Sequence, residues 1–206
     1  MFIDKKHNHL ELMPLQQKIA HEDQAAFTII YHHFNKKLIA FAQSLVHSKD
    51  IAEDVVEDVF IKLWANRFSI TQIENLSVYL YVSVKNGSLN KISEKARQLI
   101  TQPFDGIEPQ VEDLTDNPYN ILLNAELLKR MNLAINDLPP RCKMIFKLVR
   151  EDGLKYKEVS QILNISVNTI DVQMAIAIKR ICKAMGIGKK PSQNIFSSLS
   201  KKNKKL

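Results

Sequence analysis

Glycine and cysteine are scarce in this chain, which has five glycines and two cysteines among 206 residues. The low glycine content and the lack of alternating strand patterns between turn signals argue against β-rich folds and favour an all-α class. Cys142 and Cys182 lie in separate predicted helices, and neither belongs to a Cys/His cluster with metal-ligand spacing. The sequence therefore predicts a helical protein without a metal site or a cofactor.

The chain also lacks long apolar segments and catalytic clusters. No apolar run approaches the roughly 20 residues that a membrane-spanning helix needs. The N-terminus carries His7 and His9 among polar residues and has no apolar signal-peptide core. No nucleophile or carboxylate cluster with a partner set is present, so we expect a cytoplasmic protein that is not an enzyme and does not insert into membranes.

Positive charge is concentrated at the C-terminal end of the chain, whose formal net charge is +7. From Gly153 onward there are eleven Lys and Arg residues against two acids, Glu158 and Asp171, so the preceding part is slightly acidic. This uneven distribution of charge along the chain is typical of a phosphate-facing module joined to a module with another role. A solvated basic tail is the alternative, because six of the eleven cations lie in residues 189–205.

Apolar residues recur at helical spacing through most of the first half of the chain. The expected helices are Leu12–His21, Asp23–Leu45, one that starts with Ser48 or Asp50 as N-cap and ends near Trp64, and Leu76–Gln98. Gly87 and several β-branched residues weaken the last of these, so tertiary packing must stabilise it. Together these helices predict a first domain over residues 10–98.

A proline-rich acidic segment then separates this domain from a second one. Residues 101–128 hold three prolines, six acids and neither Lys nor Arg, which predicts a linker at 99–121. A second domain over 122–188 begins with a helix at Leu122–Leu138, which Pro139 and Pro140 must end, and continues with Arg141–Glu151. The basic residues 189–206 are expected to be disordered.

Residues 156–183 match the pattern of a helix-turn-helix. The first short helix, Lys157–Leu163, would bury Val159 and Leu163. Asn164 stands at the turn, where a positive φ is usual, and Ser166 is a natural N-cap for the second helix. Its inward face would consist of Ile170, Met174, Ala177, Ile178 and Ile181.

The outward face of the second helix carries side chains suited to a DNA major groove. The candidate residues are Ser166, Val167, Asn168, Thr169, Asp171, Val172, Gln173, Ile176, Lys179 and Arg180. Amides and hydroxyls can meet base edges, apolar side chains can touch thymine methyl groups, and cations suit phosphates. An ordinary helical hairpin with a polar exterior is the alternative. Because no cation precedes Lys179 and Asp171 repels phosphates, we expect weak binding by this helix alone.

Four stretches together resemble the extracytoplasmic-function group of sigma factors, particularly short Bacteroidetes-type forms. They are DQAAFTIIYHHFNKKLIAFA, DIAEDVVEDVFIKLWANR, NLSVYLYVSVKNGSLNKISEKAR and LPPRCKMIFKLVREDGLKYKEVSQILNISVNTIDVQM. Their order and spacing match the family's two domains, sigma region two and sigma region four, and the linker between them. The resemblance implies a factor that lends promoter specificity to core RNA polymerase, has no catalysis of its own, and reads the minus-thirty-five element with its helix-turn-helix.

The resemblance also assigns a polymerase-docking surface. The residues that match the family's docking patch are Asp54, Glu57, Asp58 and Lys62. A helix face that carries acids can pair with a basic partner face. Glu57 departs from the family's usual Gln, and a plain solvated acidic face is the alternative.

The helix expected at Leu76–Gln98 resembles the part of the family that opens the minus-ten element. The matching residues are Tyr79, Tyr81, Lys85, Asn86, Asn90, Lys91 and Arg97. Exposed aromatic rings can stack on unpaired bases, although each tyrosine is equally well explained as part of the core. The polar stretch Asn66–Glu74 resembles the family's specificity loop, which holds an extruded base. Many family members are also held inactive by an anti-sigma protein.

Two other classes of protein remain possible from the residues. One is a stand-alone helix-turn-helix regulator, which would bind duplex DNA tightly without polymerase. The other is an enzyme with a helix-turn-helix appendage, for which the acids at 53, 54, 57 and 58 lie on one helix without a partner set.

Overall fold

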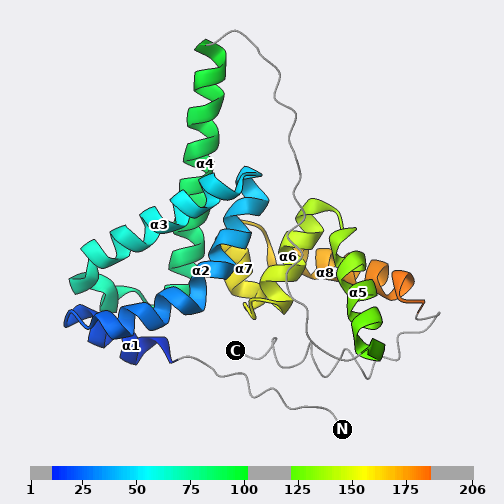
Figure 1. The fold of residues 1–206 in the computed structure, drawn as a ribbon, viewed down its shortest axis with the longest axis horizontal. Coiled ribbons are helices and arrows are strands. Elements are labelled where there is room, and N and C mark those ends of the chain that lie inside the picture. Colours follow the sequence, from blue (N-terminus) through cyan, green and yellow to red (C-terminus); the bar gives the residue numbers. More distant parts are fainter. Residues whose placement is uncertain (1–10, 102–121, 187–206) are drawn as a thin grey trace. The chain divides into compact units, whose positions relative to one another are not determined.

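The computed structural model describes residues 11–101 and 122–186, with side chains for 11–95 and 129–186. All regular elements in these ranges are helices, which confirms the all-α expectation (Figure 1). The chain divides into two compact units, Met1–Asp105 and Gly106–Leu206. Most of the expected linker and all of the expected basic tail lie outside the described residues.

Between residues 11 and 101, the first unit contains four α-helices and one 3-10 helix. They are α1 (Leu12–Ala20), α2 (Gln24–Val46), α3 (Lys49–Ala65), η1 (Arg67–Gln72) and α4 (Leu76–Thr101). The helices expected from periodicity are confirmed to within a few residues. The polar stretch expected to be a loop instead forms η1, because its buried Ile70 anchors it to the core.

Side-chain caps explain where three of these helices begin. Asp23 accepts a hydrogen bond from Ala26 N at 3.0 Å, which starts α2. Ser48, rather than Asp50, caps α3 by accepting from Ile51 N at 3.5 Å. The Asn75 side chain accepts from Val78 N at 3.0 Å at the start of α4. Each cap satisfies a backbone N–H that has no partner within its helix.

The core of the first unit lies where α2, α3 and α4 pack against one another. The α3 stripe expected to face inward is buried and comprises Ala52, Val55, Val56, Val59 and Leu63. Phe27 packs against Phe60 and Trp64, with ring centroids 6.1 and 5.0 Å apart, and thereby joins α2 to α3. Phe41 of α2 meets Tyr81 of α4 at 5.2 Å.

Gly87 allows α4 to approach α3 closely. A Cβ atom built on Gly87 would lie 3.0 Å from Cγ1 of Val55, which is itself buried. The glycine lowers the local helix propensity, but the packing it allows supplies the tertiary stabilisation that α4 was expected to need.

The second unit is built around one long helix. Its elements are α5 (Leu122–Asn136), α6 (Pro140–Arg150), α7 (Tyr156–Leu163) and α8 (Val167–Ala184), and α8 packs on the other three. Leu138, Cys142 and Ala177 form a buried cluster, against which Phe146 and Ile181 pack. Pro140 lies in the first turn of α6, where its missing N–H costs nothing.

We predict that Gly87→Ala lowers the free energy of unfolding of the first unit by about 1 kcal/mol, because overpacking against Val55 outweighs the gain in helix propensity. Val55→Ala removes the atom with which the new side chain would clash. The double variant should therefore lose less free energy of unfolding than the sum of the losses in the two single variants. The unfolding in urea is followed by the fluorescence of Trp64, the single tryptophan. Ser93→Ala, at an exposed position of α4, is the control. Strict additivity of the two changes would contradict the close approach.

Candidate nucleic-acid interface

The turn between α7 and α8 has the geometry that the sequence predicts. Asn164 adopts left-handed backbone angles, φ 53° and ψ 50°, and its N–H bonds to Ser160 O. The Ser160 hydroxyl donates to Ile165 O at 2.6 Å, and Ser166 Oγ accepts from Thr169 N at 3.0 Å. These bonds hold the entry of α8 at a defined angle to α7.

The predicted inward faces are confirmed at Val159, Ile170, Met174 and Ala177, which are buried, whereas Ile178 and Ile181 are only half-buried and the buried Ile162 was not predicted. Val159 and Ile162 are the buried residues of α7, whereas Leu163 is half-buried, so the expectation that Leu163 is a core residue is wrong. Because α7 ends at Leu163 and the chain then turns left-handed, this last side chain lies at the edge of the core. On α8, the residues Ile170, Met174 and Ala177 are buried and Ile178 and Ile181 are half-buried.

The outward face of α8 is polar with two exposed apolar residues in its middle. Val172 is 50% exposed and Ile176 is 37% exposed. The remaining candidates on this face are Ser166, Val167, Asn168, Asp171, Lys179 and Arg180, which are exposed, and Thr169 and Gln173, which are half-buried. The face therefore offers amide, hydroxyl and methyl groups to one surface, as major-groove recognition requires.

Charged residues of α8 influence the pKa values of two side chains on neighbouring helices. Burial raises the pKa of Tyr156, and the charge of Asp171 raises it further, while Arg150 opposes both. Asp171 therefore lies near the start of α7. Burial also raises the pKa of the Cys142 thiol, against the effect of Arg180, and its Sγ donates to Gln173 O at 3.3 Å.

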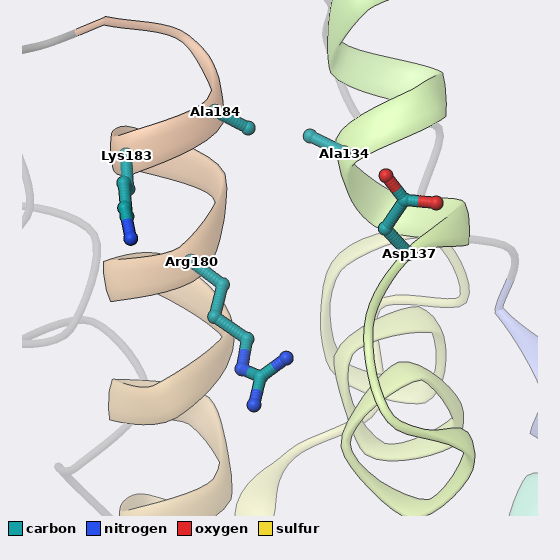
Figure 2. Close-up of a pocket in the computed structure, with 5 residues that line it drawn as sticks. All are labelled: Ala134, Asp137, Arg180, Lys183 and Ala184. Atoms are coloured by element: carbon teal, nitrogen blue, oxygen red, sulfur yellow. The ribbon is translucent and has the colours of Figure 1, made fainter.

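An open hollow of about 590 Å³ lies between α5 and α8. Figure 2 shows Arg180 extending from α8 toward Asp137, which directly follows α5 at the other side of the hollow. Lys183 follows Arg180 by three residues on α8. Two cations of the C-terminal half of α8 therefore line this hollow.

The minus-ten candidates on α4 divide into exposed and buried residues. Tyr81 is 1% exposed and packs against Phe41 in the core, so the expectation of a stacking platform at this position is wrong. Tyr79 is 39% exposed. Two residues apart on a helix, the two rings point to opposite faces. Asn86, Asn90 and Lys91 are exposed and Lys85 is half-buried, while the side chain of Arg97 lies outside the described residues.

The polymerase-docking candidates lie together on one face of α3. Asp54, Glu57, Asp58 and Lys62 are all exposed, and the spacing of three or four residues puts them on a common side. The opposite side of the helix carries the valines of the core. The arrangement leaves the acids free to face a basic partner surface.

Sequence reasoning did not identify the side chains that hold η1. The Gln16 amide Nε2 donates to Ile70 O at 2.7 Å and to Ile73 O at 2.9 Å. Arg67 Nη2 donates to Glu22 Oε1 at 2.5 Å. The only hint in the sequence is a polar residue, Gln16, on the apolar face of the first predicted helix.

Neither a membrane span nor a metal-binding group is found in the described ranges. No helix there is both long and apolar enough to cross a membrane. In the same ranges no three His, Cys, Asp or Glu residues lie close enough together to hold a metal ion.

Comparison with known proteins matches one family model to each unit. Residues 30–98 match sigma-70 region 2 and residues 128–181 match sigma-70, region 4. The ECF RNA polymerase sigma-E factor of Escherichia coli (strain K12) is 26% identical over 163 residues, which are 76% of this chain and 84% of that protein. The sigma-E factor of Haemophilus influenzae is 24% identical over 162 residues, 76% of this chain and 85% of that protein.

A solved structure has a similar fold. The sigma factor RpoE from Bartonella quintana, determined in complex with the anti-sigma factor NepR, superposes with a TM-score of 0.58 at 23% identity. The match covers 79% of this chain and 98% of that chain. It supports the same two-unit helical architecture.

We predict that Asn164→Val destabilises α7 and α8 by roughly 1–2 kcal/mol, because a β-branched residue resists a positive φ, whereas Asn164→Gly has little effect. Amide hydrogen exchange of the two helices, read by mass spectrometry, measures the difference. Gln161→Val, at an exposed helical position of α7, is the matched control. Equal protection in Asn164→Val and the control would contradict the role of the turn.

Proposed function

The chain belongs to the sigma-70 family, and we propose that its two helical units divide the reading of a promoter between them. As a sigma factor, it directs promoter-specific transcription by RNA polymerase. The observation that carries the proposal is the order of the matches: region 2 falls on the first unit and region 4 on the helix-turn-helix. The proposed domains are residues 10–98 and 122–188, with an acidic connection at 99–121.

We assign the minus-thirty-five element to the outward face of α8, from Ser166 to Arg180. The left-handed turn at Asn164 and the cap at Ser166 support this, because they hold the N-terminal part of α8 at a defined angle. Val172 and Ile176 would contact thymine methyl groups, since exposed apolar residues on a polar face are otherwise unexplained. Lys179 and Arg180 would contact phosphates.

The minus-ten strand would be read by α4 and the segment before it. Tyr79 supplies an exposed ring on which an unpaired base can stack, worth roughly 1–3 kcal/mol. Asn86 and Asn90, four residues apart and both exposed, can bond to base edges. Lys85 and Lys91 would follow the backbone, as would Arg97, and residues 66–74 would receive an extruded base.

Core RNA polymerase is the proposed partner of the α3 face that carries Asp54, Glu57, Asp58 and Lys62. Their common exposure supports a docking role, because acids held on one face can steer and register a basic partner. The polymerase supplies the chemistry, so this chain needs no catalytic residue, and we place it in the cytoplasm where transcription occurs. An anti-sigma protein is a further proposed partner, by analogy with the Bartonella quintana complex.

Within the family, we propose a short extracytoplasmic-function factor of the Bacteroidetes type. The four sequence stretches that resemble this group support it, together with the similarity to ECF sigma-E factors. A stand-alone regulator remains the second candidate, which the lack of a cation before Lys179 on α8 disfavours. Tight sequence-specific binding of duplex DNA by the protein alone would favour that candidate.

We expect the purified protein, added to core RNA polymerase, to stimulate run-off transcription from a subset of a genomic promoter library. The expected result is a set of transcripts with shared minus-thirty-five and minus-ten elements, because both units contribute to selection. Core polymerase alone is the control. The absence of any stimulated transcript would contradict the proposed role in promoter selection.

Tyr79→Ala should slow promoter opening by roughly 5- to 150-fold, the effect of losing one stacked base, with little change in stability. Tyr81→Ala should instead destabilise the first unit by about 3–5 kcal/mol, because it empties a core position. Opening is followed by permanganate reactivity of unpaired thymines, and stability by thermal unfolding. Equal effects of the two variants on stability would contradict the assignment.

A further inference from the structure

The recognition segment, residues 66–74, contains too little structure to hold its own shape. It consists of the six-residue 3-10 helix η1 and its flanks. Short 3-10 helices have poor hydrogen-bond geometry, and at the end of η1 the backbone offers only the bond from Ile73 N to Ile70 O at 3.1 Å. Ile70 is its one fully buried side chain, so contacts from elsewhere must set its conformation.

The C-terminal end of the segment is held by Gln16 of α1. This side chain is 2% exposed, and its amide has two N–H donors. One donor bonds to Ile70 O and the other to Ile73 O, at 2.7 and 2.9 Å. The two carbonyls lie at the end of η1, so one buried amide caps it from a helix more than fifty residues earlier in the chain.

The N-terminal end of the segment is held by the turn that follows α1. Arg67 donates to Glu22, whose backbone has a positive φ of 66°. The same guanidinium donates to Trp64 O at 3.3 Å, and its Cζ lies 5.2 Å from the Trp64 ring centroid and 4.4 Å from that of Phe68. Arg67 is therefore restrained by a carboxylate, a carbonyl and two rings.

Together, the hydrogen bonds of Gln16 and those of Arg67 determine how residues 66–74 orient their exposed side chains. Phe68 is 65% exposed. The other exposed residues of η1 are Ser69, Thr71 and Gln72. A displacement of about 1 Å is enough to misalign hydrogen bonds to a bound base. The position of α1 and its turn is therefore coupled to whatever the segment recognises.

We propose that α1 is a positioning element for base selection, with Gln16 and Glu22 as its positioning residues. The inference rests on the proposed role of residues 66–74 in receiving an extruded base, and goes beyond it by assigning control of the choice to a different helix. α1 precedes the residues matched by the region 2 model, which begin at 30. Variation in α1 would then change promoter choice without any change in a DNA-contacting residue.

The decisive variant is Gln16→Met, which keeps the length of the side chain and removes both N–H donors. Gln17→Met, one residue along on the exposed side of α1, is the matched control. Each variant is combined with core polymerase and transcribes a promoter library randomised at every minus-ten position. Sequencing of the transcripts gives the base preference at each position, and Trp64 fluorescence verifies folding.

Alanine variants of Phe68, Ser69, Thr71 and Gln72 first identify the promoter position that the segment reads. Gln16→Met should reduce the preference at that same position by at least about fivefold, the smallest discrimination expected from one good base contact. Preferences at the other positions should stay unchanged, as should all preferences of Gln17→Met. An even loss at all promoters, or an unchanged preference, would overturn the inference.

Glu22→Gln is a second variant and decides the matter if Gln16→Met does not fold. It weakens the ion pair with Arg67 at a largely exposed site. The control is Lys49→Gln, which breaks the exposed ion pair with Glu53. A smaller change at the same promoter position supports the proposal, and no change overturns it. If the alanine variants alter no preference at all, the proposed role of residues 66–74 fails first, which distinguishes the two failures.

Discussion

The close approach of α4 to α3 at Gly87 is the contact on which the first unit depends. Val55 of α3 occupies the space that a side chain on Gly87 would need, so α3 and α4 pack closely against each other, and both pack against α2. Their remaining faces are then exposed. The acids of α3 and the amides of α4 consequently remain exposed, and we propose that the acids face a protein partner and the amides face unpaired bases.

A comparable constraint acts in the second unit at the turn before α8. The left-handed Asn164 and the capping Ser166 fix the angle between α7 and α8, and the packing of α8 on three helices makes its inner face part of the core. The outward face can then carry polar residues, with Val172 and Ile176 among them, and still belong to a rigid helix. Rigid presentation matters because base discrimination needs hydrogen bonds held in register.

Several features were predictable because they depend on local geometry alone. The caps at Ser48 and Ser166, the positive φ of Asn164 and the end of α5 before Pro139 all follow from the preferences of one residue and its nearest neighbours. The helix limits were accurate for the same reason. The surfaces of α3 and α8 were predictable too, since helical periodicity separates their polar and apolar residues.

The sequence by itself determined the helices, the turn and the family, because these depend on spacing and short motifs. Only the tertiary structure decided between Tyr79 and Tyr81, since both fit a helix and burial depends on where Phe41 lies. It also decided that residues 67–72 form a 3-10 helix held by Gln16 and Glu22. Those partners lie about fifty residues away in the chain, so no local pattern could reveal them.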